Sequence, residues 1–81
     1  MNIDKFDRVM EEIKQERKRQ TEKWGEQDHS DAHWLAILIE EVGEIAKEIV
    51  EAKATGSGDG YSMRKKIIHA VAVGAQWLEK L

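Results

Sequence analysis

The stretch IEEVGEIAKEIVE, residues 39–51, places five glutamates among isoleucines and valines. At about 100° per residue, its apolar side chains fall on one face and its glutamates on the neighbouring arc. This spacing of three and four favours an amphipathic helix over a strand. We therefore expect a helix from Ala32 to about Ala54, with an apolar face formed by Leu35, Leu38, Val42, Ile45, Ala46 and Ile49.

The same periodicity predicts a first helix over about residues 3–24, with Gly25 as its stop and Ser30 or Asp31 as the cap of the second helix. Its apolar face turns polar toward the end, in the order Ile3, Phe6, Val9, Met10, Ile13, Arg17, Gln20 and Trp24.

A third helix is expected from Met63 to the C-terminus, capped by Ser62 and preceded by a flexible loop, TGSGDG, at residues 55–60. Its face also carries Lys66, and an ammonium group on an apolar face needs a partner. The other members of this face are Met63, Ile67, Ala70, Val71, Val73, Gly74, Trp77, Leu78 and Leu81.

No strand pattern is present, so the prediction is one all-α domain over residues 1–81. A core of this size is marginal when it stands alone, and the chain has no cysteine to reinforce it. We therefore expect a three-helix amphipathic unit that completes a four-helix-type bundle by homo-oligomerisation, as a homodimer or homotetramer.

The charge pattern limits the partners. Net charge is −3, which disfavours a nucleic-acid polymer, and the charge divides into +1 over residues 1–24, −7 over 25–62 and +3 over 63–81. No apolar run approaches the ~20 residues that cross a bilayer, and the N-terminus does not resemble a secretion signal. A cytoplasmic protein without membrane contact is the expectation.

The acidic arc has two interpretations. Charge runs on helices are usually solvated faces, which suits Glu40 and Glu51, whereas Glu48 can pair with a nearby lysine. Glu41 and Glu44 differ, because they lie one turn apart near the apolar border, where their mutual repulsion matters more. Such a carboxylate pair suits a hard cation such as magnesium.

The chain also resembles the small, often phage-encoded, MazG-like nucleoside triphosphate pyrophosphohydrolases. The resemblance rests on EEVGE at residues 40–44, which matches their EExxE motif, together with ERKRQTEKWGEQDH (16–29), WLAILIEEVGEIAKEI (34–49) and MRKKIIHAVAVGAQWLEKL (63–81). It implies an all-α oligomer that hydrolyses NTPs or dNTPs to the monophosphate and pyrophosphate. The cofactor it implies is Mg²⁺, with Mn²⁺ as an alternative.

By this resemblance, Glu41 and Glu44 are metal ligands, and Glu40 is a supporting catalytic carboxylate. A second motif is expected in MRKKIIHAV, where Lys66 stands at its glutamate position and His69 at its aspartate position. His69 in neutral form could still bind a metal, whereas protonated Lys66 could instead take the place of the cation and pair with the glutamates. That substitution predicts weaker magnesium binding and reduced hydrolysis, unless Lys66 reaches the surface and Glu48 or Glu51 completes the site.

The predicted substrate pocket uses the end of the first helix. Trp24 would stack on a base and Arg17 or Lys23 would meet phosphate, with Gln20 and Lys66 also facing the substrate. His33 and Trp34 are further candidates for the pocket wall. Two alternatives to the enzyme stay open: a module that binds a nucleotide without cleaving it, and an interaction protein whose acidic face pairs with a partner.

Overall fold

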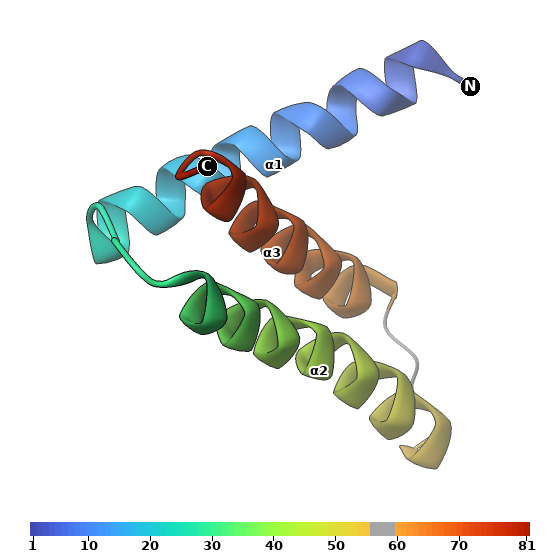
Figure 1. Ribbon diagram of the computed structural model, residues 1–81. Coiled ribbons are helices and arrows are strands. Elements are labelled where there is room, and N and C mark those ends of the chain that lie inside the picture. The colour runs from blue at the N-terminus through green and yellow to red at the C-terminus, as the bar shows by residue number, and fades with distance from the viewer. Residues whose placement is uncertain (56–59) are drawn as a thin grey trace.

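The computed structural model describes the backbone of residues 1–55 and 60–81 and the side chains of residues 1–52 and 62–81. Within these ranges the chain forms α1 (Ile3–Trp24), α2 (Asp31–Thr55) and α3 (Gly60–Leu78), with no strand. α2 and α3 lie side by side and antiparallel, and α1 crosses α3 (Figure 1). The prediction of an all-α chain is confirmed, whereas the predicted TGSGDG loop falls largely outside the described residues.

Capping groups set both ends of α1. Asn2 Oδ1 accepts hydrogen bonds from the backbone N–H groups of Asp4 and Lys5, each at 3.1 Å, and so satisfies two of the free donors of the first turn. Gly25 ends the helix with φ +72°, a conformation that costs glycine little, and its N–H donates to Thr21 O at 2.8 Å. The predicted bounds of this helix and its stop at Gly25 are confirmed.

The starts of the other two helices differ in how well they were predicted. Ser30 Oγ accepts a hydrogen bond from the His33 N–H at 3.2 Å, so Ser30 caps α2 as expected. α3 already includes Gly60, so Ser62 lies in its first turn and the prediction that Ser62 caps the helix was wrong. Ser62 therefore lies inside α3 instead of immediately before it, where an N-cap residue would be.

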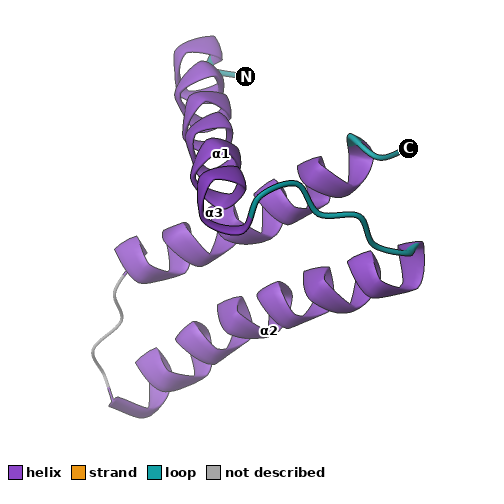
Figure 2. Ribbon diagram, turned by 90° about the vertical axis from the view of Figure 1, so that its left-hand side faces the viewer, coloured by secondary structure: helices purple, strands orange, loops and turns teal. Residues whose placement is uncertain are grey.

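α3 is the central helix, because it packs on both α1 and α2, while α1 and α2 make no close backbone approach within the described ranges. Figure 2 shows α1 running across the α2–α3 pair instead of along it. A central helix needs two buried faces. Lys66 and Trp77 contact α2 residues, whereas His69 contacts α1, and Ala72 and Gln76 are buried on the same side as His69.

The prediction that α3 has one buried face was therefore incomplete. Ala70 and Val73 are buried as expected, but Val71 and Leu78 are exposed within one chain. Helical spacing identifies an apolar face, but it does not reveal that a second face, made of small and polar residues, lies under another helix.

α2 turns a different face toward α3 from the one predicted. Trp34 is only 1% exposed, and Glu41, Ile45 and Glu48 continue its line as half-buried residues. The predicted core residues Leu35, Val42, Ala46 and Ile49 are exposed instead. The helix is thus rotated, so that its most apolar stripe lies at the surface of the single chain and two of its glutamates lie nearer the interior.

The first half of α1 is similarly uncovered. Ile3, Phe6 and Met10 are exposed, and this part of α1 projects beyond the α2–α3 pair (Figure 1). Ile13 is the first buried residue of α1, at the point where the helix reaches α3. None of the described helices has the length and apolar character needed to span a bilayer.

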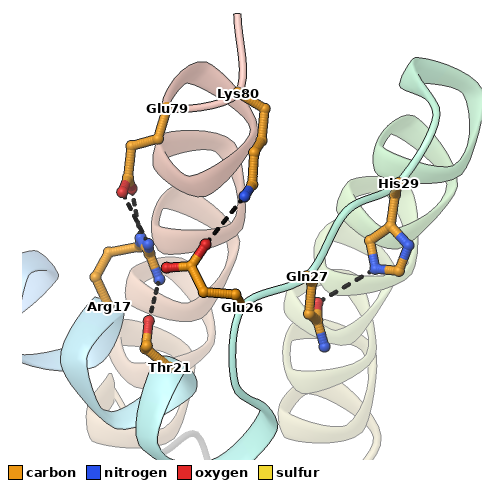
Figure 3. Close-up of polar contacts among 7 residues, drawn as sticks. All are labelled: Arg17, Thr21, Glu26, Gln27, His29, Glu79 and Lys80. Carbon is orange, nitrogen blue, oxygen red and sulfur yellow. Dashed lines mark hydrogen bonds and ion pairs between the residues drawn. The ribbon is translucent and has the colours of Figure 1, made fainter.

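Ion pairs fasten the end of α3 to α1 and to the connector (Figure 3). Arg17 donates from Nε to Glu79 Oε2 at 2.7 Å and from Nη2 to Glu79 Oε1 at 3.0 Å. Lys80 Nζ lies 3.1 Å from Glu26 Oε2 in the connector. These contacts hold the connector close to the end of α3.

Candidate functional site

A cavity of about 470 Å³ lies where the end of α1, the connector, the start of α2 and the middle of α3 meet. We call it the central cavity. It is lined by Glu16, Arg19, Gln20, Lys23, Trp24, Gln27, His29, His33, Trp34, Ile37, Glu41, His69, Val73 and Gln76.

Glu16 is the buried charge at the base of this cavity, with 8% of its surface exposed. Arg19 donates two hydrogen bonds to its carboxylate, each at 2.7 Å, and Gln20 Nε2 donates a third at 3.1 Å. The hydrogen bond from Arg19 is the main cause that lowers the pKa of Glu16, against the opposing effect of burial. Glu16 is therefore an ionised, acceptor-only group that orients its neighbours.

Three buried polar atoms of the cavity-lining residues have no hydrogen-bond partner among the described residues: Gln20 Oε1, Trp34 Nε1 and His69 Nε2. His69 Nε2 approaches Glu16 Oε2 only to 3.6 Å. A buried polar atom without a partner costs about 1–3 kcal/mol. Three such atoms around one cavity indicate that a polar group supplies their partners.

Aromatic rings form much of the wall. The rings of His29 and His33 stack with their centroids 4.3 Å apart, and the rings of His29 and Trp34 lie edge to face with their centroids 4.9 Å apart. His29 Nε2 lies 3.3 Å from Gln27 Oε1, so the connector contributes a fixed polar pair to the wall (Figure 3). Lys23 Nζ lies 4.8 Å from the ring centroid of Trp24. Flat ligands suit such a wall, because aromatic faces stack favourably.

The structure brings together five of the residues selected from the sequence. Gln20, Lys23, Trp24, Glu41 and His69 all line the central cavity, although Trp24 is 60% exposed at its edge. They come from three helices, so the crossing of α1 over α3 is what makes them neighbours. His33 and Trp34, also named as wall candidates, lie in the same lining.

Arg17 lies apart from this group. Its guanidinium is held by Glu79 and also donates from Nη1 to Thr21 Oγ1 at 3.2 Å (Figure 3). Arg17 is absent from the lining of the central cavity and instead lines a separate pocket with Thr21 and Glu79. The Arg17 side chain was expected to contact phosphate, but it is held in an interhelical ion pair outside the central cavity.

The two glutamates of the EEVGE motif that were expected to hold a metal lie in different surroundings. Glu41 is half-buried and lines the central cavity, with no ion pair to a described residue. Glu44 is more exposed, and its Oε2 lies 3.8 Å from Lys66 Nζ. The expectation that Lys66 would pair with this acidic pair is met at Glu44. Glu40 is exposed, outside the cavity lining.

Among the described residues, no group of three or more histidines, aspartates and glutamates is close enough together to hold a metal ion. Glu41 and Glu44 supply two carboxylates, and an ammonium group accompanies the second. Magnesium is commonly held by one or two carboxylates together with waters and substrate phosphates. One chain offers this pair of carboxylates, but the ammonium group of Lys66 beside Glu44 opposes a cation there.

Sequence reasoning passed over several residues of the cavity. Glu16, Arg19, Gln27 and Gln76 are part of the lining, but were not proposed as site residues. A signal for Glu16 was available, because Glu16, Gln20 and Lys23 recur at spacings of four and three on one helix face. Gln76 had no such signal, since it sits within an apolar helix.

Comparisons of the chain with protein-family models, with curated proteins and with solved structures found no match.

Proposed function

We propose that this chain is a MazG-like domain that binds a nucleoside triphosphate in the central cavity, in the cytoplasm. The supporting observation is the composition of that cavity. It combines aromatic rings, unpaired polar atoms and the charged groups of Lys23 and Glu41 within about 470 Å³. Pockets of a few hundred Å³ with mixed apolar and polar walls suit ligands of nucleotide size.

The reaction of this proposal is the one that the resemblance implies: hydrolysis between the α and β phosphates, with release of the monophosphate and pyrophosphate. In that reaction magnesium would bind the triphosphate, and the resemblance assigns Glu41 and Glu44 as the carboxylates that would hold it. The ammonium group of Lys66 beside Glu44 opposes that metal, so the proposal predicts weak magnesium binding.

A second candidate is a module that binds a nucleotide without cleaving it. The observation that favours it is the ion pair between Lys66 and Glu44, with 3.8 Å between Nζ and Oε2. The ammonium group of Lys66 provides positive charge at the acidic pair without a metal. In this candidate Glu41 and Glu44 have a structural role, and the nucleotide is a signal or an effector.

The proposal includes self-association as a homodimer or homotetramer. Leu35, Ile39 and Val42 are exposed on α2, and Val42 keeps 51% of its surface in contact with solvent. Beside them, Leu38 and α3 form an apolar groove of about 480 Å³, lined by Leu38, Ala70, Val71, Gly74, Ala75 and Leu78. A second copy of this surface is a suitable cover, because apolar helix faces associate when they exclude water.

One assay separates the two candidates. The protein is incubated with each of the common NTPs and dNTPs, with and without Mg²⁺ or Mn²⁺, while pyrophosphate release and thermal stabilisation are measured in parallel. Release with a divalent cation supports the pyrophosphohydrolase. Stabilisation by a nucleotide without release supports the binding module. If no nucleotide causes release or stabilisation, nucleotide binding is contradicted. The remaining alternative is then an interaction protein whose acidic face pairs with a partner.

A further inference from the structure

We infer that the inner wall of the central cavity recognises the edge of an uncharged planar ring, through Gln20 Oε1 as acceptor and Trp34 Nε1 as donor. Given the proposed function, on which this inference rests, that ring is the nucleobase. Such a ring has to supply one hydrogen-bond donor and one acceptor, as a lactam or an amidine does. Every nucleobase supplies both, whereas a phosphate offers acceptors only.

The orientation of the Gln20 amide follows from its neighbour. Gln20 Nε2 donates to Glu16 Oε2 at 3.1 Å, and an ionised carboxylate can only accept. The amide nitrogen must therefore face Glu16, which leaves Oε1 facing away from it. Because Oε1 is buried without a partner, the group that it lacks is a donor.

Trp34 has the opposite requirement. Its indole N–H can only donate, it is buried without a partner, and the side chain is 1% exposed. Buried tryptophans usually find an acceptor for this group. Trp77 illustrates the usual case, since its Nε1 donates to Asp31 Oδ1 at 2.9 Å. The missing partner of Trp34 is therefore an acceptor.

The charges of the wall favour a neutral group at this depth. Arg19 and Lys23 carry positive charge and Glu16 and Glu41 carry negative charge, so the formal charges of the lining cancel. Arg19 is further committed to Glu16 by two hydrogen bonds. A polyphosphate gains little beside the buried carboxylate of Glu16, whereas a neutral ring can stack on the paired rings of His29 and His33.

The two recognition atoms are themselves buried, so a ligand reaches them only after a side chain of the wall rotates. Binding should therefore change the surroundings of Trp34 directly. This gives a measurement on the native protein, because the indole N–H of each of the three tryptophans has its own NMR signal.

The experiment records ¹H–¹⁵N spectra of the full chain during titration with uridine, cytidine, adenosine and guanosine, and separately with tripolyphosphate. The Trp34 signal is assigned from the spectrum of Trp34→Phe. We expect at least one nucleoside to move the Trp34 indole signal downfield in a saturable way, and tripolyphosphate to leave it unchanged. A Trp34 signal that does not respond to any nucleoside overturns the inference.

The affinity of the tightest NTP for variants provides the second readout. Trp34→Phe removes the donor but keeps an aromatic ring, and Gln20→Leu removes the acceptor. Each should weaken binding about tenfold, the usual effect of one hydrogen bond of roughly 1.4 kcal/mol. Trp77→Phe is the control and should bind like the wild type. Circular dichroism establishes that each variant is folded.

The failures are distinguishable. If the wild type binds NTPs and both cavity variants bind them equally well, the inference falls and the proposed function stands. If the wild type binds no nucleoside and no nucleotide, both the inference and the proposed function are contradicted.

Discussion

Lys66 Nζ of α3 lies 3.8 Å from Glu44 Oε2 of α2, with 30% of the Lys66 side chain exposed. The pair joins two helices at the position where the resemblance expects a metal between carboxylates. An exposed pair at this distance contributes less than about 1 kcal/mol to stability. Its importance therefore lies in the charge that it places at the acidic pair.

Lys66→Glu should convert this position from a cation to a third carboxylate beside Glu44. We expect the variant to have a lower melting temperature than the wild type without magnesium, because like charges then face each other. Millimolar Mg²⁺ should restore it, while the wild type should show little response. Calorimetric titration with Mg²⁺ measures the same difference directly.

Lys14→Glu is the matched control for this prediction. Lys14 is exposed on α1, away from Glu41 and Glu44 on α2, so its reversal changes the net charge equally without altering the Glu44 pair. Tight magnesium binding by the wild type that Lys66→Glu does not improve would contradict the role given to Lys66.

Glu16 should make the fold sensitive to acid. The hydrogen bond from Arg19 lowers the pKa of Glu16 below its ordinary value of 4.5, so the folded state favours the carboxylate more than the unfolded state does. This contribution is complete above the unfolded pKa and is lost as pH falls below 4.5 through the folded pKa. Thermal melts from pH 7 to pH 3 measure it.

Glu16→Gln isolates that contribution. At pH 7 the substitution should cost about 1–3 kcal/mol, because Arg19 loses a charged acceptor. The pKa values of Glu12 and Glu79 are also lowered, by hydrogen bonds from Arg64 and Arg17, but these effects are common to both proteins. The variant should therefore lose less stability on acidification than the wild type. Equal losses would refute the assignment to Glu16.

Arg17 and Glu79 should show measurable coupling. Their two hydrogen bonds, at 2.7 and 3.0 Å, join α1 to the residue just beyond α3, and a bidentate pair is better oriented than a typical surface pair. A double-mutant cycle with Arg17→Met and Glu79→Gln should give a coupling energy of about 0.5–1 kcal/mol, weaker in 1 M salt. The cycle of Lys18→Met with Glu79→Gln, which tests a neighbouring exposed cation, should give nearly zero. Coupling of similar size in both cycles would contradict a specific interaction between Arg17 and Glu79.

Val42→Glu should prevent self-association without unfolding the chain. Val42 is exposed in the single chain, so a charge there costs little in a monomer but is unfavourable in an apolar interface. Sedimentation equilibrium should give a dimer or tetramer for the wild type and a smaller species for the variant. Glu40→Gln, on the exposed arc, should behave like the wild type. A wild-type protein that stays monomeric at high concentration would rule out this part of the proposal.

Local signals proved sufficient for much of the helix layout. The cap Ser30 and the stop at Gly25 act on neighbouring residues, so sequence alone could locate the ends that they define. Asn2, which caps α1, was not named from the sequence although its signal is equally local. The start of α3 was misjudged, because a serine with cap chemistry at residue 62 lies inside the helix.

The buried faces of the helices could not be predicted from such local signals. Apolar periodicity selected Leu35, Val42 and Ile49 for the core, yet α2 turns Trp34 and Glu41 inward. The pattern records apolar surface without stating whether the same chain or another one covers it. A chain whose apolar surface exceeds its own core is therefore misread by a single-chain argument.

The candidate site depended on both kinds of information. Gln20, Lys23 and Trp24 were selected from one helix and Glu41 and His69 from others, and the structure brings all five to one cavity. Glu16 was missed, although it shares a helix face with Gln20 and Lys23, because that spacing does not show that Glu16 is buried. Arg17 was selected by its place on the α1 stripe, but its partner Glu79 is distant in sequence.

Isothermal titration calorimetry with non-hydrolysable NTPs measures directly whether the central cavity binds a nucleotide. We expect saturable binding of one nucleotide per chain, substantially weaker in Lys23→Glu and unchanged in Lys14→Glu, since Lys14 lies on α1 outside the cavity lining. No binding heat with any NTP, or equal affinity in the two lysine variants, would contradict nucleotide binding in this cavity.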